Sequence, residues 1–260
     1  MNPNGERLTF LSLSWRRYDD AMSKPLSQDS FVIHPIGWVE SPYVEKFGAP
    51  RQSGLVTAAK GCLRLVPECA KEEALEGLDG FSHLWVIFIF DRCEGESKFS
   101  VRPPRLGGNK SIGVFASRSP FRPNNLGLSV LKIEAINKQE GIIEVSGLDL
   151  VEGTPIVDIK PYVAYVDAVS DAVSGFAYEP PGLVDVFFEE NADQQLKQLP
   201  DGESLKTLIE QTLGLDPRPA YKKNKMDSQV YGTALGAWNI RWQVKQEHIR
   251  VLTLEPYSVI

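Results

Sequence analysis

The sequence of 260 residues is poor in the residues that build disulfides and metal sites, with three cysteines and three histidines. Cys62, Cys69 and Cys93 form no CxxC pair and leave an odd number, so disulfides are not expected. The histidines show neither the HxxxH nor the HExxH spacing of zinc enzymes. The sequence therefore predicts a protein without a metal site, suited to a reducing compartment such as the cytoplasm.

Long apolar runs and common cofactor motifs are also missing. The longest strongly apolar run, LWVIFIF at 84–90, is far shorter than the roughly 20 residues that cross a membrane. Residues 1–21 lack the apolar core of a secretory signal. GxGxxG and GxxxxGK[ST] do not occur, so a Rossmann or P-loop domain has no support. We expect no membrane partner.

Acidic residues are absent from one long stretch, although the net charge of the chain is −6. From Ser97 to Ile133 there is no Asp or Glu, and the basic residues there are Lys98, Arg102, Arg105, Lys110, Arg118, Arg122 and Lys132. A second basic stretch near the C-terminus contains Arg218, Lys222, Lys223 and Lys225. Two such patches predict that an acidic protein binds a polyanion locally.

The first two-thirds of the chain has a mainly β pattern. Apolar runs bounded by Gly and Pro predict strands at 54–66, 84–90, 126–136, 141–151 and 155–163. The continuous apolar run at 84–90 indicates burial on both faces. We expect a hairpin connection at 137–141 and a short helix within 67–80. Strands at this spacing favour a closed or nearly closed barrel.

The last third has a different pattern. Residues 168–182 end in Pro180-Pro181-Gly182 and are predicted to be a linker. Residues 183–198 and 202–214 look helical, and 238–244 alternate with strand period. A partner strand is expected at 249–254, so we predict a smaller α+β domain over 183–260.

Two early stretches carry candidate binding residues. Arg51 and Gln52 lie between Pro50 and Gly54, where a surface turn with a solvated arginine is the alternative. His83 stands at the start of a buried strand, where a hydrogen-bonded structural histidine is the alternative to a ligand donor.

The acid-free stretch carries the most specialised loop, GVFASRSPFRPNNLGLSV at 113–130. Prolines fix its backbone, and arginine forks suit phosphate or carboxylate groups and can stack on a base. The loop is therefore predicted to bind a nucleotide-like ligand. Tight barrel corners with solvated charges are the alternative.

A last stretch, SGLDLVEGTPIVDIKPY at 146–162, follows a strand with Asp149. The EGTP turn is expected to expose backbone N–H groups to a ligand, and Thr154 adds a hydroxyl. Asp158 and Lys160 share one face of a strand, where an ion pair and a binding site are equally good interpretations.

These motifs have a familiar order. KFGAPRQSGL, FSHLWVIFIF, VRPPRLGG, GVFASRSPFRPNNLGLS and DLVEGTPIVDIKPY closely resemble the TsaA-like/TrmO family over roughly residues 31–167. The C-terminal DPRPAY, VYG and NIRWQV resemble the second domain of its bacterial members. The resemblance implies a TsaA-like barrel domain at 31–167 after an N-terminal extension, residues 1–30, that is expected to be disordered.

The resemblance implies a homodimeric S-adenosylmethionine-dependent tRNA methyltransferase acting on N6 of N6-threonylcarbamoyladenosine, beside the anticodon. The cofactor contacts it implies are Pro50, Arg51, Gln52, His83, Arg118, Leu128, Leu148, Asp149, Leu150, Gly153, Thr154 and Pro155. The candidate substrate residues are Arg105, Asn109, Arg122, Asn124, Lys160 and Tyr162, with Arg105, Arg122 and Lys160 as options for the threonyl carboxylate. Asp149 is the candidate general base.

The loop at 113–130 departs from the usual pattern of the family. Asn125 stands where the family usually has proline, and we expect it to loosen the loop slightly.

Two other functions compete with a tRNA methyltransferase. A non-catalytic RNA-binding barrel would not bind the methyl donor. A methyltransferase of small metabolites would act without tRNA.

Overall fold

The computed structural model describes residues 31–93, 97–223 and 228–258. Contacts between residues divide the chain into Met1–His34 and Pro35–Ile260, and the description below concerns the second unit. The expected extension at 1–30 lies outside the described residues. Since Pro35–Ile260 forms one compact unit, the finer division at 167 and 182 stays a prediction.

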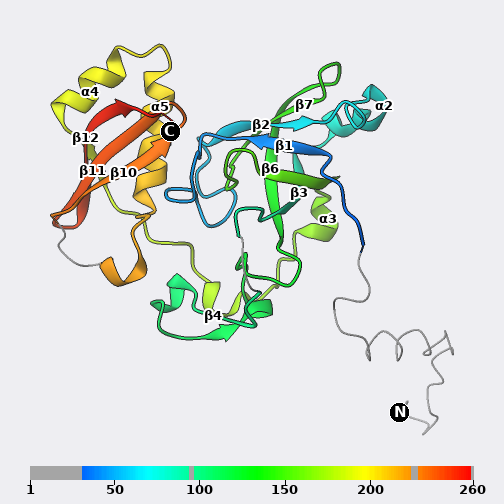
Figure 1. Ribbon diagram of the computed structural model, residues 1–260, viewed down its shortest axis with the longest axis horizontal. Coiled ribbons are helices and arrows are strands. Elements are labelled where there is room, and N and C mark those ends of the chain that lie inside the picture. Colours follow the sequence, from blue (N-terminus) through cyan, green and yellow to red (C-terminus); the bar gives the residue numbers. More distant parts are fainter. Residues whose placement is uncertain (1–30, 94–96, 224–227, 259–260) are drawn as a thin grey trace, which may run out of the picture. The chain divides into compact units, whose positions relative to one another are not determined.

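A closed barrel of six antiparallel strands forms the first part of this unit, as Figure 1 shows. The barrel confirms the predicted fold class, and its strand order is β1-β2-β7-β6-β3-β8. The strands are β1 (Gly37–Glu40), β2 (Lys60–Leu65), β3 (His83–Ile89), β6 (Leu126–Asn137), β7 (Ile142–Ser146) and β8 (Pro155–Pro161).

Strand β3 shows how alternation fills the barrel. Leu84, Val86 and Phe88 point inward and are 0–3% exposed, whereas the residues between them are half-buried. The predicted burial of both faces was therefore wrong, because only one face of this strand meets the core. Phe88 packs against Gly127 on β6, where a Cβ atom would meet the phenyl ring at 2.2 Å.

The connections between barrel strands differ partly from their predicted form. The hairpin between β6 and β7 is confirmed. Strand β2 begins at Lys60, so residues 54–59 of the predicted strand form a loop. The predicted helix at 67–80 is reduced to α2 (Glu72–Leu75) and η1 (Leu78–Gly80).

A long excursion between β3 and β6 carries the acid-free stretch. It contains a two-stranded ribbon of β4 (Ser100–Val101) and β5 (Ile112–Gly113), with η2 (Pro104–Leu106) between them and η3 (Val114–Ala116) after them. The loop of residues 117–125 then returns to β6. Apart from Lys132 on β6, the basic residues of this stretch are thus presented on irregular backbone rather than on the barrel wall.

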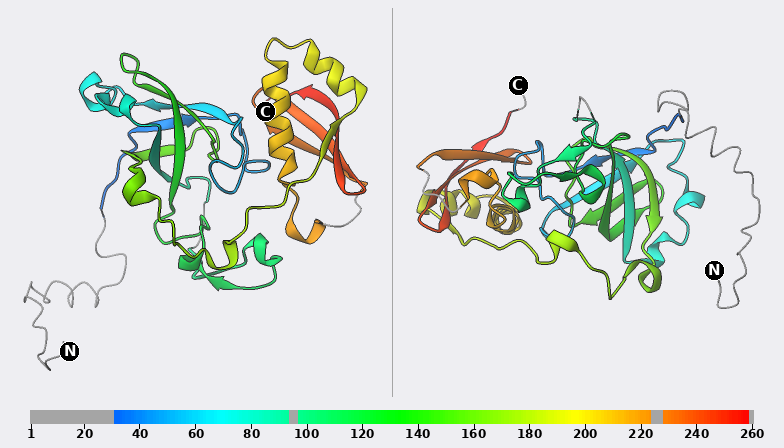
Figure 2. Two further views of the ribbon diagram at one scale, coloured as in Figure 1. Left: turned by 180° about the vertical axis from the view of Figure 1, so that it is seen from behind. Right: turned by 90° about the horizontal axis from the view of Figure 1, so that it is seen from below.

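The last part of the chain builds a four-stranded sheet with two helices against one face, as Figure 2 shows from two sides. Its strands, in the order β10-β11-β12-β9, are β10 (Val230–Leu235), β11 (Trp238–Lys245), β12 (His248–Pro256) and β9 (Val186–Phe188). The helices are α4 (Glu190–Lys197) and α5 (Gly202–Gly214). The predicted α+β character is confirmed.

Two details of this part correct the sequence interpretation. The helix predicted over 183–198 begins only at Glu190, because Val186–Phe188 pairs in parallel with β12 as an edge strand. The predicted linker at 168–182 contains the short turn η4 (Gly175–Ala177) and follows α3 (Ala164–Asp167). A further turn, η5 (Ala220–Lys222), precedes β10. None of the helices in the described residues could cross a membrane.

Candidate active site

Asp149 is a half-buried carboxylate just beyond the end of β7. Ser129 on β6 donates a hydrogen bond of 2.8 Å from Oγ to Oδ1 of Asp149. Burial raises the pKa of Asp149 to about 6, although Ser129, the backbone N–H groups of Asp149 and Ser53, and the charge of Arg118 oppose that rise. A carboxylate with this pKa is ionised at neutral pH and is basic enough to accept a proton.

Two loops that are far apart in the sequence meet beside this carboxylate. The guanidinium of Arg118, in the loop before β6, donates to Oε1 of Gln52, in the loop before β2. Ser53 and Arg118 both act on the pKa of Asp149, so the two predicted ligand loops and the predicted base lie close together. The sequence indicated each of these loops but not their contact.

Arg122 holds its own loop together. Its Nη1 atom donates to the carbonyl oxygens of Ser117 at 2.7 Å and Val114 at 3.2 Å. Its guanidinium also lies 5.7 Å from the ring centre of Phe115. Arg122 is therefore committed in part to fixing the loop on which Arg118 stands, which the prediction of a substrate role did not foresee.

Asn125 also fixes this loop rather than loosening it. The residue has a φ of 48°, in the left-handed region that asparagine tolerates and proline cannot adopt. Its Nδ2 atom donates a hydrogen bond of 2.7 Å to the carbonyl oxygen of Pro120. The predicted loosening was wrong, because the asparagine side chain supplies a local bond.

The turn at 152–155 does not offer the N–H donors that we expected. The N–H groups of Glu152, Gly153 and Thr154 donate to the carbonyl oxygens of Tyr43, Val39 and Val151 at 2.8, 2.8 and 3.1 Å, respectively. The Thr154 hydroxyl donates to Val151 at 2.6 Å, and Glu152 accepts a bond from the N–H of Ser41. This expectation was wrong. The side chains of Leu148 and Leu150 are 0% and 3% exposed and belong to the core.

A second group of predicted residues lies on the outer face of the barrel. The Nδ1 atom of His83 lies 2.8 Å from Ser82 Oγ, and its ring meets Tyr162 edge to face at 6.2 Å. Lys160 and Asp158 form an ion pair of 3.0 Å, as one of the two interpretations predicted. Leu128 is 50% exposed and shares a row across the strands with Ile87 and Asp158.

The basic residues of the acid-free stretch form what we call the basic rim: Lys98, Arg102, Arg105, Lys110 and Arg118, all exposed. In the described part of the chain none of these five forms an ion pair, whereas Lys132 pairs with Glu134 at 2.9 Å. Phe99 and Phe115, 69% and 73% exposed, stand among them. Asn109 and Asn124 are exposed here too, and Arg105 donates to the carbonyl oxygen of Glu179.

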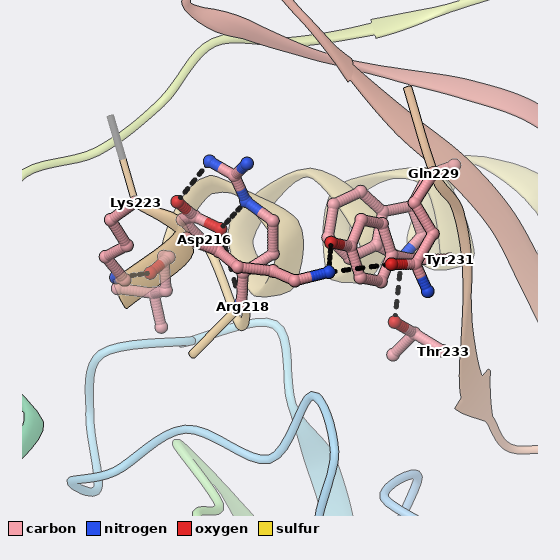
Figure 3. Close-up of polar contacts among 9 residues, drawn as sticks. Asp216, Arg218, Lys223, Gln229, Tyr231 and Thr233 are labelled. Atoms are coloured by element: carbon pink, nitrogen blue, oxygen red, sulfur yellow. Dashed lines mark hydrogen bonds and ion pairs between the residues drawn. The ribbon is translucent and has the colours of Figure 1, made fainter. Parts of the chain in front are cut away.

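Only part of the second basic stretch lies on the surface of the protein. Figure 3 shows Arg218 forked on Asp216, with bonds of 2.8 and 2.9 Å, and the two side chains are only 5% and 7% exposed. Arg218 is therefore not part of a basic surface, contrary to the prediction. Lys222 donates to Gln229 and Tyr231, and Lys225 lies outside the described residues.

Ser129, Ser53 and Tyr43 were missed by the sequence interpretation. Ser129 is a polar residue at an inward position of the alternating run at 126–136, and that misfit was the signal to follow. Tyr43 is fully buried, and both burial and the nearby charge of Asp149 raise its pKa. No group of three or more His, Cys, Asp or Glu within the described ranges could hold a metal ion.

Comparison with known proteins places the chain in a family. Residues 38–168 match the tRNA-methyltransferase O N-terminal domain, and residues 181–257 match the TrmO C-terminal domain. The chain belongs to the tRNA-methyltransferase O family.

Relatives support this assignment over nearly their whole length. The chain is 42% identical to a tRNA (adenine(37)-N6)-methyltransferase of Escherichia coli K12, over 87% of this chain and 99% of that one. It is 45% identical to RcsF of Pseudomonas aeruginosa, assigned by name to the S-adenosylmethionine-dependent methyltransferases, over 85% and 96%. A crystal structure of TrmO from Pseudomonas aeruginosa superposes with a TM-score of 0.73 at 37% identity, over 87% and 99%.

Proposed function

We propose that this chain is a methyltransferase that moves a methyl group from S-adenosylmethionine to N6 of adenine 37 in tRNA. The observation that carries the proposal is the match of both parts of the chain to one family of tRNA methyltransferases, together with a basic carboxylate at the centre of the site. We further propose N6-threonylcarbamoyladenosine as the substrate base, as the family resemblance implies.

The side chains of the site fit the methyl donor. Arg118 is an exposed cation for a carboxylate, Gln52 is an amide for a ring nitrogen or hydroxyl, and Leu128 is an exposed apolar side chain for a flat base. S-adenosylmethionine supplies, when bound, a methyl group activated by a sulfonium. We propose contacts from Pro50, Arg51, Gln52, His83, Arg118 and Leu128, and from the backbone at 148–150, since the N–H groups of 152–154 are already paired.

Asp149 is the proposed general base. Its carboxylate would accept the proton of N6 as the nitrogen bonds the methyl carbon and the bond from that carbon to the sulfonium sulfur breaks, leaving a neutral thioether and no positive charge on the product nitrogen. Ser129 holds the carboxylate in place, and the burial that raises the pKa of Asp149 improves it as a base. The remaining acceleration comes from holding the reacting groups in line, which needs neither a nucleophilic side chain of the protein nor a metal.

The basic rim is the proposed surface for the tRNA backbone. Its exposed arginines and lysines can contact phosphates, and Phe99 and Phe115 offer rings on which unpaired bases stack. Among the options for the threonyl carboxylate, Lys160 is already paired with Asp158 and Arg122 is partly used by its loop. Arg105 donates to the carbonyl oxygen of Glu179 but is exposed, whereas Arg122 is half-buried, so we favour Arg105 for that contact, with Asn109, Asn124 and Tyr162 as further substrate residues.

A homodimer in the cytoplasm is part of the same proposal. The outer face of the barrel carries Trp85 and Ile87, which are half-buried in the single chain, and Leu128, which is exposed. A second copy of the chain would cover such a face.

One experiment tests the proposed function. The purified protein is incubated with S-adenosylmethionine and tRNA carrying N6-threonylcarbamoyladenosine, and the nucleosides are analysed by mass spectrometry. We expect the N6-methylated nucleoside, and no product with tRNA that carries plain adenosine at position 37. Binding of tRNA without binding of the methyl donor would instead support a non-catalytic barrel. Turnover without any tRNA would support a small-metabolite methyltransferase.

A further inference from the structure

The segment that carries Arg51 and Gln52 is anchored on the C-terminal sheet. We call residues 42–58 the anchored segment. Tyr43 forms a β-bridge with Leu235 of β10, and the N–H of Gly236 donates to the carbonyl oxygen of Pro42 at 2.7 Å. The ring of Phe47 stacks on Trp242 of β11, with 6.5 Å between centroids. Both strands therefore hold the beginning of this segment.

A close contact fixes the middle of the anchored segment. Gly48 has a φ of 100°, and a Cβ atom there would lie 2.4 Å from Cγ2 of Thr233 on β10. The hydroxyl of Thr233 accepts a bond of 2.9 Å from Nε1 of Trp242, which fixes the rotamer of the threonine. The glycine is needed for this close approach of backbone to side chain.

Helix α5 holds both ends of the anchored segment. Oε1 of Gln211 accepts bonds from the N–H of Ala58 at 2.9 Å and from Oγ1 of Thr57 at 3.3 Å. Oγ1 of Thr212 lies 3.4 Å from the hydroxyl of Tyr43, and these two side chains are 1% and 0% exposed. Gln211 and Thr212 are thus adjacent residues of one helix that bond opposite ends of the same loop.

The other side of the anchored segment faces the candidate active site. Gln52 accepts a bond from Arg118, and Gly54 donates to the carbonyl oxygen of Gly147, two residues before Asp149. Lys223 lies in the part of the chain shown in Figure 3, and burial together with the charges of Arg51 and Arg218 lowers its pKa. The segment therefore stands between the C-terminal sheet and helices on one side and the site of methyl transfer on the other.

We propose that Gln211 and Thr212 of α5 are positioning residues for the methyl donor, which act through the anchored segment on Arg51 and Gln52. The proposal rests on the proposed function, because it takes this segment as part of the donor site. Each bond removed from the segment leaves its backbone less well placed, so that binding the donor must first order it. The C-terminal part of the chain is then a component of the donor site and not only a contact surface for RNA.

The test compares Thr212→Val and Gln211→Ala with the wild-type chain. Valine keeps the shape of the buried threonine but removes its hydroxyl, and Gln211 is half-buried, so at least one of the two variants should fold. We expect the Kd and the KM for S-adenosylmethionine to rise about fivefold in each, as for the loss of a hydrogen bond, with kcat at saturating donor changed less than about twofold. Thr212→Ser should restore the wild-type values.

Thr207→Val is the matched control. Thr207 lies on the exposed side of the same helix, and its hydroxyl donates to the carbonyl oxygen of Glu203. The control should leave the donor Kd unchanged, and melting temperatures of all variants show whether folding is affected. If wild-type protein methylates tRNA while Thr212→Val and Gln211→Ala bind the donor as wild type does, this inference is wrong and the proposed function stands. If the variants bind the donor more weakly but wild-type protein methylates no tRNA, the inference stands and the proposed substrate is wrong.

Discussion

The hydroxyl of Ser129 donates to Oδ1 of Asp149 across 2.8 Å and joins strand β6 to the segment after β7. A hydrogen bond to the ionised carboxylate lowers its pKa, yet the pKa of Asp149 stands at about 6 because burial outweighs the bond. The pair therefore combines two properties that a general base needs. Its position is fixed, and its affinity for a proton is raised.

Replacing Asp149 by asparagine should remove the proposed base. General base catalysis contributes roughly 10²–10⁴-fold in rate, so we expect kcat of Asp149→Asn to fall by about that factor. In the wild type, kcat/KM should rise with pH up to about 6 and then level off, because the carboxylate must be ionised to accept a proton. Initial rates with labelled donor, measured across this pH range, report both effects.

A surface variant separates this effect from a general loss of charge. Asp171→Asn changes an exposed aspartate and should keep the rate and pH profile of the wild type. A pH profile of Asp149→Asn with an unchanged rise near pH 6 would show that another group takes the proton.

Asp149→Asn should also stabilise the folded chain at high pH. The pKa of Asp149 is raised from its ordinary value of 3.8 to about 6, so the folded state holds the proton more tightly than the unfolded state does. Above a pH of about 6 the folded chain therefore holds Asp149 ionised in a buried position, which destabilises the fold. Below a pH of 3.8 the group is protonated in both the folded and the unfolded state, so it has no such effect. We expect a melting temperature of Asp149→Asn a few degrees above that of the wild type in mildly alkaline buffer, and no gain in acid, since each kcal/mol shifts Tm by roughly 2–4 °C in a chain of this size. Equal melting temperatures in alkaline buffer would contradict this role of burial.

The sequence predicted the strands that local patterns define, but not the contacts between distant residues. The runs at 126–136 and 155–163 correspond to β6 and β8 because apolar alternation and flanking turns decide such elements locally. The N–H groups of Glu152 and Gly153 are paired with Tyr43 and Val39, which lie far away in the sequence. No local pattern reveals those partners, and so the turn was taken for a donor site.

Two further errors concern the last part of the chain. Val186–Phe188 was assigned to a helix because the polar pattern after it is helical, but pairing with β12 makes it a strand. Arg218 was assigned to a basic surface, although Asp216, at a φ of 48°, turns its carboxylate onto the guanidinium and both side chains are buried. The candidate site was predicted from loops rich in arginine, proline and glycine, which are unusual locally whatever they contact later.

Arg118→Ala should weaken binding of the methyl donor. The variant loses a guanidinium that stands beside Asp149 and bonds Gln52, and a charge-assisted hydrogen bond is worth roughly 1–3 kcal/mol. We expect the Kd for S-adenosylmethionine in calorimetry to rise about tenfold or more. Arg102→Ala removes an exposed cation of the same basic rim, and as the control it should leave this Kd unchanged. An unaltered Kd in folded Arg118→Ala would exclude Arg118 from the donor site.

Neutralising the basic rim should weaken tRNA binding in a salt-dependent way. Arg102→Ala and Lys110→Ala each remove an exposed cation that has no ion pair within the described residues. Each should raise the KM for tRNA, and the plot of log affinity against log salt concentration should become shallower by about one for each phosphate that is no longer neutralised. Equal slopes for wild type and variants would place the RNA elsewhere.

Asn125→Pro tests whether the loop of Arg118 depends on its left-handed residue. Proline cannot adopt a φ of 48°, and the variant also loses the bond from Nδ2 to Pro120 and the N–H bond to Arg122. We expect a loss of about 1 kcal/mol or more in stability and a higher Kd for the methyl donor. Asn125→Gly keeps access to the φ value and loses only the side-chain bond, so its effects should be smaller. If Asn125→Pro melts and binds the donor as wild type does, the loop has a second stable conformation in which Arg118 still reaches Gln52.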